Sequence, residues 1–453
     1  MAQLFTEAEN RLLTQTGPGT PMGELMRRYW IPAFLSERLP MENSEPFEIT
    51  LLGESLVAFR GRNGQVGLMD SKCPHRRASL VLARVEDDCA LRCIYHGWKV
   101  DAQGQVLETP PEPPNSRFAQ SIRHRAYPTR EAGGIIWTYM GPEEERPEFP
   151  MWPFNGLPEG HVWANHFYQP SNWLQGLEGD LDAAHGGYLH YSKEEWDRQR
   201  NSNSRLGKFL FDPRPQTAVE PAPWGLQTAF RYHLEEENEA VFWIHPLISP
   251  FYTMFSHAED GAQGGLFHAW VPSTDDSHYV YSVVWQRESP LTEDRRQAID
   301  ATQGYTAVDK ANGYLSVNWD GKGYRQDRES MTEGLSFSGF EGVHLQDLAI
   351  QHSMGPVVDR SKENLCAEDF LIIQARRFFL ETLEKLARGE ELPALQPGMD
   401  YSRIEHRWVF APSSTSLAEV LTRKDWDSST EENTRDVSTV KAAWSALGVD
   451  GAV

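Results

Sequence analysis

The chain has 453 residues, a formal net charge of −22, 4 cysteines and 40% hydrophobic residues. The acidic balance argues against general nucleic-acid binding, because a phosphate backbone would be repelled. No apolar run of about 18 residues is present, which argues against a membrane span, and the N-terminal stretch does not have the pattern of a secretory signal. Four cysteines in so long a chain exclude a disulfide scaffold. We therefore expect a cytoplasmic globular protein of about two domains.

The first third of the chain divides into two predicted segments. Residues 1–44 contain two short helices, expected at 6–16 and 21–30, which we predict to pack on the larger domain that follows. Residues 45–150 alternate short apolar runs with turn residues such as Arg62-Asn63-Gly64, a pattern typical of strands. This segment is predicted to be a small all-β domain.

The rest of the chain is predicted to form a larger mixed domain and a tail. Residues 151–423 contain a series of strands and then a long amphipathic helix, expected at 367–388. Residues 424–453 are polar and acidic. The predicted fold class is therefore α+β.

Cysteine and histidine occur in two matched pairs within the all-β segment. Cys73 and His75 form C-x-H, and Cys93 and His96 form C-x2-H. Zinc fingers group cysteine with cysteine and histidine with histidine, whereas a Rieske [2Fe–2S] cluster takes two thiolates on one iron and two imidazoles on the other. We expect a Rieske cluster, with a zinc knuckle as the alternative and with the two remaining cysteines, Cys89 and Cys366, as packed thiols.

A second group of metal-binding residue types lies at the start of the larger domain. His185 and His190 are five apart, which on an ideal helix would point the rings in different directions. Gly186-Gly187 between them could unwind the helix and bring both imidazoles to one ion. Two histidines and a carboxylate form the facial triad of non-haem Fe(II) oxygenases. The alternative interpretation is a pair of hydrogen-bonded core histidines.

The carboxylate of such a triad has several candidates. Asp182 is spaced to hydrogen-bond a ligand histidine rather than to bind the metal. Asp369 at the start of the long helix is our preferred third ligand, because its face of the helix is the apolar one. Glu368 is the second candidate and Asp347 the third. A simple role at the helix N-terminus is the alternative for Asp369.

These motifs together resemble a known family, the large (α) subunit of the Rieske non-haem iron aromatic-ring oxygenases. Two further motifs resemble its phthalate 4,5-dioxygenase branch in particular. The resemblance covers about residues 10 to 412. The motifs that carry it are C-x-H-R-R and C-x-Y-H-G-W between Cys73 and Trp98, E-x3-D-x2-H-x4-H from Glu178 to His190, E-D-x-x-I-I from Glu368, G-T-P-M-G-x-L-M-R-R-Y-W from Gly19 and S-M-G-P-V-V-D-R from Ser353.

The resemblance implies a fold and an assembly. The larger domain should be a helix-grip catalytic domain, an antiparallel sheet around a long C-terminal helix. The subunits should form a homotrimer, or stacked trimers that make a hexamer. Electrons should then pass from the cluster of one subunit to the iron of its neighbour, with His96 meeting Asp182 of the next subunit. The resemblance also favours Asp369 over Asp347 as the iron ligand.

The resemblance further implies a terminal oxygenase, a dioxygenase or a monooxygenase, that activates O2 at a mononuclear Fe(II). The sequence contains no nicotinamide fingerprint, and its two remaining cysteines cannot build a four-thiolate ferredoxin cluster. A separate NAD(P)H-dependent reductase of the ferredoxin-reductase type should therefore supply the electrons.

The expected substrate is an aromatic carboxylate of the phthalate type, as in aromatic hydrocarbon catabolism. Arg205, Arg214 and Arg231 are the candidate residues for binding its carboxylates, since guanidinium groups pair with them bidentately. O-demethylation of a methoxylated aromatic acid on the same metals is the alternative. An electron carrier with only the cluster, or a zinc-stabilised binding protein, would be the rivals from other classes.

Overall fold

The computed structural model describes residues 5–41, 44–193, 214–233, 238–256, 264–317, 324–404 and 406–422. The chain divides into two compact units. The smaller unit comprises Gln15–Pro150 with Val271–Asp275, and the larger one comprises Met1–Thr14, Met151–Trp270 and Asp276–Val453. The polar tail 424–453 lies outside the described residues.

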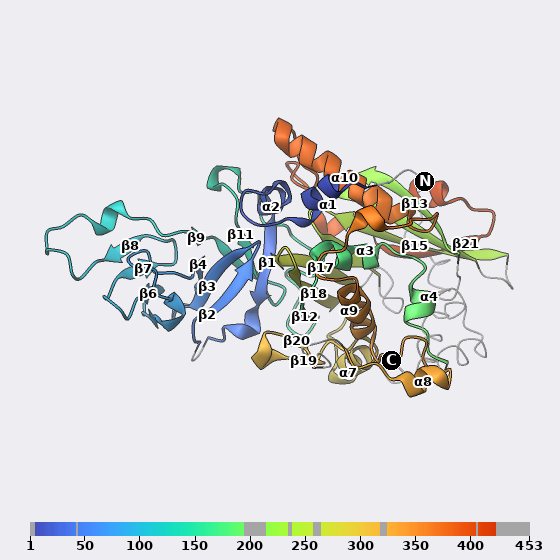
Figure 1. Ribbon diagram of the computed structural model, residues 1–453, viewed down its shortest axis with the longest axis horizontal. Helices are drawn as coiled ribbons and strands as arrows, with labels where there is room; N and C mark the ends of the chain where they lie inside the picture. The colour runs from blue at the N-terminus through green and yellow to red at the C-terminus, as the bar shows by residue number, and fades with distance from the viewer. Residues whose placement is uncertain are drawn as a thin grey trace. The chain divides into compact units, whose positions relative to one another are not determined.

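The smaller unit is built from three antiparallel sheets (Figure 1). Buried Val57, Phe59, Met69 and Leu91 belong to the apolar cluster that joins its strands. The all-β prediction for this segment is confirmed. The sheets are β2 (Phe47–Leu51), β3 (Glu54–Arg60), β4 (Val66–Asp70) and β9 (Ala126–Tyr127); β5 (Arg84–Val85), β6 (Ala90–Arg92), β7 (Lys99–Asp101) and β8 (Val106–Glu108); and β1 (Trp30–Leu35), β11 (Ile135–Tyr139) and β10 (Thr129–Ala132).

The N-terminal segment is divided between the two units, which corrects the prediction that 1–44 packs as a whole on the larger domain. Helix α1 (Glu7–Thr14) belongs to the larger unit, whereas α2 (Pro21–Arg27) and β1 belong to the smaller one. The side chain of Thr20 caps α2 by accepting a hydrogen bond from the Gly23 amide, and Pro21 follows it. The second helix is therefore shorter than predicted, and Trp30 begins a strand instead.

The larger unit is built on an eight-stranded antiparallel sheet. Its long helix α10 (Phe370–Arg388) packs against β13 and β14 and ends at Gly389 in the left-handed conformation. A sheet covered by a long C-terminal helix confirms the predicted helix-grip architecture (Figure 1). The strand order is β12 (Val162–Gln169), β18 (Ser277–Gln286), β17 (Gly264–Thr274), β16 (Tyr252–Phe255), β15 (Glu239–Ile248), β14 (Gly225–His233) and β13 (Gln216–Ala222), with β21 (Arg407–Pro412) paired to β15.

Shorter helices surround this sheet, and two of them, α3 and α9, contact each other. None of the helices within the described ranges is both long enough and apolar enough to cross a bilayer. The remaining elements of the unit are α3 (Trp173–Asp180), α4 (Gly186–Leu189), α7 (Glu293–Gln303), α8 (Arg328–Thr332), α9 (Val343–Ser353), α11 (Leu417–Thr422), β19 (Val308–Asp309) and β20 (Leu315–Ser316).

Candidate metal centres

The two Cys/His loops of the smaller unit adopt the same backbone turn. In each loop the amide of the cysteine donates to the carbonyl five residues later, and the cysteine carbonyl accepts from the amide four residues later, at 2.8 to 2.9 Å. The residue at that fourth position has a positive φ, 61° for Arg77 and 73° for Gly97. The Cys73 loop follows β4 and the Cys93 loop follows β6, so the two turns present their cysteines from adjacent sheets.

The side chains of these loops meet in two like pairs. The Nδ1 atoms of His75 and His96 lie 3.1 Å apart, and the ring of Trp98 stacks on His75 at 4.7 Å between centroids. The thiols of Cys73 and Cys93 are within hydrogen-bond reach of each other. Burial and the neighbouring Cys93 thiol raise the pKa of Cys73 to about 11. The buried Cys73 thiol is therefore protonated without metal, and iron binding must release its proton.

This arrangement fits a two-iron cluster better than a single zinc ion. Four zinc ligands converge on one ion at bond lengths of about 2.0–2.3 Å, so their donor atoms must all be neighbours. Among the residues that the structure describes, the only group of three or more whose donor atoms lie within 4.8 Å of one another is His185, His190 and Asp347. The Cys73, Cys93, His75 and His96 donors form separate thiol and imidazole pairs, as a [2Fe–2S] cluster requires.

The other two cysteines take no part in this centre. Cys89 is buried and its thiol donates to the Gln65 carbonyl at 3.3 Å, which agrees with a packed thiol. Cys366 is exposed. The prediction that it is a packed thiol is therefore wrong.

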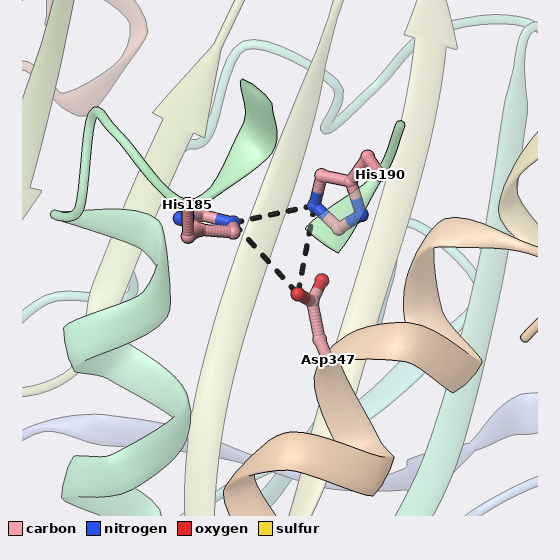
Figure 2. Close-up of side chains that lie close together, drawn as sticks. All are labelled: His185, His190 and Asp347. Atoms are coloured by element: carbon pink, nitrogen blue, oxygen red, sulfur yellow. Dashed lines mark hydrogen bonds and ion pairs between the residues drawn. The ribbon is translucent and has the colours of Figure 1, made fainter. Parts of the chain in front are cut away.

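His185, His190 and Asp347 point toward one another in the larger unit (Figure 2). The Nε2 atoms of the two histidines are 3.2 Å apart, and Oδ1 of Asp347 lies 3.8 Å from His185 Nε2 and 3.6 Å from His190 Nε2. Each of the three side chains is 21 to 28% exposed. Two imidazoles and one carboxylate around one point form the donor set of the non-haem Fe(II) facial triad.

His185 and His190 flank a single helical turn, which a break separates from the helix before it. Helix α3 ends at Asp180, and the single helical turn α4 lies between His185 and His190. Gly186 and Gly187 are inside this turn, so the bend does not occur at the glycines as expected. Because the helix ends early, Glu178, Asp182 and His185 do not share one helical face as their spacing had suggested.

Both ligand histidines are held through their second ring nitrogen. His185 Nδ1 lies 3.0 Å from the carbonyl oxygen of Asp182, and His190 Nδ1 lies 2.6 Å from Oε1 of Gln346. Gln346 is fixed in turn, because its Nε2 donates to the Phe340 carbonyl at 2.9 Å. Both Nδ1 atoms therefore carry the proton, which leaves both Nε2 atoms free to bind a metal.

The electrostatics of the three ligands also suit a cation. Burial opposes a charge on His185, but Asp182 and Asp347 raise its pKa to about 9. Burial raises the pKa of Asp347, while His190 and His185 lower it. In the apoprotein His185 is therefore protonated at neutral pH. A metal ion that replaces this proton can bind the carboxylate and both imidazoles together.

The structure places Asp347, and not the preferred Asp369, beside the two histidines. Helix α10 begins at Phe370, so Asp369 lies at its N-terminal cap, and its Oδ2 accepts a hydrogen bond from the Cys366 amide at 2.7 Å. This is the helix-terminus role that had been the alternative. The second candidate, Glu368, is exposed. Partial burial raises its pKa, and the charges of Asp182 and Asp369 raise it further.

Other residues of the predicted site have structural partners. Glu178 pairs with two buried arginines, at 2.9 Å from Arg360 and 2.7 Å from Arg376. Arg231 donates to Oε1 of Gln216 at 2.7 Å and to the Ser413 carbonyl. Arg214 is exposed, and Arg205 lies outside the described residues. The structure brings none of these described arginines to the ligand group.

Comparison with known proteins agrees with both centres. Residues 29–128 match the Rieske [2Fe-2S] domain family, and residues 138–430 match the family described as LigXa C-terminal domain like. The chain is 36% identical over 441 residues to the 3-chlorobenzoate-3,4-dioxygenase oxygenase subunit of Comamonas testosteroni, covering 94% of this chain and 97% of that one. The chain belongs to the Rieske oxygenase α subunits.

Further relatives support the same family. The phthalate 4,5-dioxygenase oxygenase subunit of Pseudomonas putida is 35% identical and covers 85% of this chain and 88% of its own. The 5,5'-dehydrodivanillate O-demethylase oxygenase subunit of Sphingobium sp. is 32% identical, covering 86% of this chain and 84% of its own. A crystal structure of dicamba monooxygenase shares the fold, with a TM-score of 0.54 at 16% identity over 81% of this chain and 99% of that one.

The chain is accordingly the terminal oxygenase component of a Rieske oxygenase system, with a [2Fe–2S] cluster, a mononuclear iron and O2 as co-substrate. The match of residues 138–430 to a catalytic domain excludes an electron carrier that has only the cluster. The smaller unit therefore contributes a one-electron centre, and the larger unit contributes the site of oxygen chemistry.

Proposed function

We propose that this oxygenase hydroxylates an aromatic carboxylate, with Cys73, Cys93, His75 and His96 holding the cluster and His185, His190 and Asp347 holding the iron. The observation that carries the proposal is the convergence of these last three side chains within 4.8 Å, with a hydrogen bond on the second nitrogen of each histidine. When bound, the cluster supplies single electrons and the iron supplies open positions for O2. The protein's part is to hold both histidines in the metal-binding tautomer.

The substrate class is proposed from the relatives. Two of them are named for 3-chlorobenzoate and phthalate, both aromatic carboxylates. O-demethylation of a methoxylated aromatic acid is the second candidate, because a third relative is named as an O-demethylase and the same metal ligands would serve both reactions. A dioxygenase adds both oxygen atoms to its substrate, whereas a demethylase releases formaldehyde.

Metal analysis and oxygen uptake test this proposal. Purified protein should contain three irons and two acid-labile sulfides per chain, since a two-iron cluster is joined by one mononuclear iron. With reductase and NAD(P)H, a panel of aromatic acids should include at least one that stimulates O2 uptake, and formaldehyde assays separate demethylation from dihydroxylation. Zinc in place of iron, or only two irons, would contradict the assigned centres, and uptake stimulated by no acid would contradict the substrate class.

We further propose that the electrons come from a separate NAD(P)H-dependent reductase, because the relatives are named as oxygenase subunits.

A homotrimer, single or stacked as a hexamer, is the proposed assembly, with Asp182 of one subunit accepting a hydrogen bond from His96 of the next. The Asp182 side chain is 29% exposed, and only its Oδ1 has hydrogen-bond partners among the described residues. Its Oδ2 is therefore available to a neighbouring subunit. The cytoplasm, where NAD(P)H is present, remains the expected location.

Replacement of Asp182 tests this bridge. Asp182→Asn keeps an oxygen for the amides of Ala184 and His185, so both metals should be retained. Reoxidation of the reduced cluster by O2 in a single turnover should nevertheless slow by about 100-fold or more, since a charge-assisted hydrogen bond is lost. Glu368→Gln, which neutralises the carboxyl beside Asp182, should leave the rate nearly unchanged. Normal transfer in Asp182→Asn and Asp182→Ala would show that Asp182 is not the bridge.

A further inference from the structure

A buried carboxylate outside the assigned metal centres ends helix α3. The side chain of Asp180 is 11% exposed and accepts three hydrogen bonds, from Thr253 Oγ1 at 2.5 Å, Trp270 Nε1 at 2.7 Å and His268 Nδ1 at 3.1 Å. Burial opposes its ionisation, but His268 and the other donors hold its pKa below the ordinary value. Asp180 is therefore a fixed negative charge inside the larger unit.

Asp180 determines the orientation of the His268 ring. Nδ1 of His268 faces the carboxylate, which directs Nε2 to the opposite side of the ring. His268 is only 8% exposed, and its Nε2 has no hydrogen-bond partner among the described residues. A buried polar nitrogen without a partner is costly, and a bound ligand or water is the usual explanation.

His344 has the same unsatisfied nitrogen. It lies on α9 one turn before Asp347 and is 5% exposed, and its Nε2 also has no partner within the described part of the chain. The rings of His268 and His344 are 5.6 Å apart between centroids. Phe167 at 4.8 Å and Tyr305 at 4.9 Å flank His344. Two polar nitrogens among aromatic rings are the composition of a site for a ring with one polar substituent.

This pair of histidines is close to the iron ligands. The rings of His268 and His344 adjoin each other, and His344 belongs to the helix that carries Asp347. The spacing of three residues also places His344 on the same side of α9 as Asp347. The unpartnered nitrogens thus belong to the surroundings of the proposed iron.

Three of the described arginines have structural partners. Arg231 donates to Gln216 and Ser413, and the fully buried Arg360 and Arg376 face Glu178. The Nε2 atoms of His268 and His344, in contrast, have no partner among the described residues. A carboxylate that reached them would receive one hydrogen bond from each ring.

We propose that His268 and His344 bind the carboxylate of the aromatic substrate through their Nε2 atoms and that Asp180 is the positioning residue for His268. In this complex His268 donates Nδ1–H to Asp180 and Nε2–H to the substrate, so its ring lies between two carboxylates. His344 donates as a neutral imidazole. This inference rests on the proposed oxygenase function and assigns the group that selects an acid among aromatic compounds.

The test compares binding of 3-chlorobenzoate with that of 3-chlorobenzamide, its neutral counterpart, by titration calorimetry on the iron-loaded protein. The protein should prefer the acid. His268→Asn and His344→Asn should each weaken acid binding by about tenfold or more, because a hydrogen bond to a charged group is lost, and should change amide binding much less. Asp180→Asn should weaken acid binding while the iron and sulfide content stays normal.

Arg231→Gln is the matched control, because this arginine was the sequence-based candidate for the same carboxylate. It should leave the preference for the acid unchanged. The proposal is overturned if the protein does not prefer the acid, if both histidine variants keep the preference, or if Arg231→Gln abolishes it. Oxygen uptake with other aromatic compounds would persist in each of these cases, so failure of this inference is distinct from failure of the oxygenase assignment.

Discussion

The two metal-binding regions are held together over very different distances along the chain. The four proposed cluster ligands come from two short loops, and each loop is closed by its own backbone hydrogen bonds. Two of the proposed iron ligands flank the α4 turn and the third lies on the distant helix α9, and Gln346 of the same helix orients His190. A local turn can be recognised from sequence spacing, whereas a site assembled from distant helices depends on how the helices pack.

The third iron ligand gives the largest expected effect. Asp347→Ala should remove the mononuclear iron and lower turnover by more than about 100-fold, since loss of an outer partner alone costs 10–100-fold. The cluster should remain, so iron falls from three to two per chain while sulfide and visible colour are unchanged. Asp369→Ala is the matched control and should keep all three irons. If Asp369→Ala loses the iron and Asp347→Ala retains it, the ligand assignment is reversed.

The same pair of aspartates shows where prediction from sequence stops. Asp369 was preferred because it precedes the apolar face of a long helix, and the helix itself was predicted correctly. Its first residue, however, is Phe370, so the Asp369 side chain turns back to the Cys366 amide. No spacing rule links Asp347 to His185 and His190, because only the packing of α9 brings them together.

The sequence did contain one signal for α9 that was missed. Most of its buried residues are polar or small, with His344, Gln346 and Gln351 among them. A buried helix face of this composition needs polar partners elsewhere in the fold. Asp180 and His268 were missed for a similar reason, since their hydrogen bond joins the end of α3 to strand β17. The four proposed cluster ligands could be grouped from the sequence because they lie within two local loops.

The ion-pair network that joins α3 to the C-terminal part of the chain gives the next largest effect. Glu178→Gln would leave Arg360 and Arg376 buried without a full counter-charge, which should lower the free energy of unfolding by about 3–5 kcal/mol. Glu384→Gln on α10 removes an exposed pair with Arg388 at 3.3 Å and should cost about 0–1 kcal/mol. Denaturant unfolding measures both changes, and equal small costs would show that this network does not hold the iron region together.

The loss of stability caused by Glu178→Gln should depend on pH in a definite direction. Burial opposes the charge of Glu178, but Arg360 and Arg376 hold its pKa below the ordinary value. Its stabilisation is therefore complete above the normal glutamate pKa and is lost as the pH falls through the lowered value. The difference in the free energy of unfolding between the wild-type protein and Glu178→Gln should accordingly become smaller in acid.

The hydrogen bond behind His190 gives a smaller effect. Gln346→Leu removes the acceptor of His190 Nδ1, 2.6 Å away, and should weaken binding of the mononuclear iron by about 10–100-fold. Competition with a chelator, followed by iron analysis, measures the affinity. Gln351→Leu, on the same helix but bonded to Gln169, is the control and should leave iron affinity nearly unchanged. Unchanged affinity in Gln346→Leu would mean that α9 supplies a ligand but no orientation.

The smallest effect concerns the cluster loops, where the turn is local. Gly97 has a φ of 73°, and a Cβ there would lie 3.2 Å from Cγ of Pro110. Gly97→Ala should therefore cost about 1–2 kcal/mol of stability, which the midpoint of cluster bleaching on denaturation would report. The cost should fall on the smaller unit alone, because no part of the turn comes from elsewhere in the chain.

Arg77 occupies the equivalent position in the other loop with a φ of 61°, so that turn already accommodates a side chain. Arg77→Gly should relieve about 1 kcal/mol of strain. Loss of its exposed pair with Asp70, at 3.2 Å, offsets about 0–1 kcal/mol of that gain. Opposite signs for Gly97→Ala and Arg77→Gly would show that the two loops are the same turn carried by different residues. Stabilisation by both, or destabilisation by both, would mean that contacts beyond the backbone turn determine how each loop holds its cysteine.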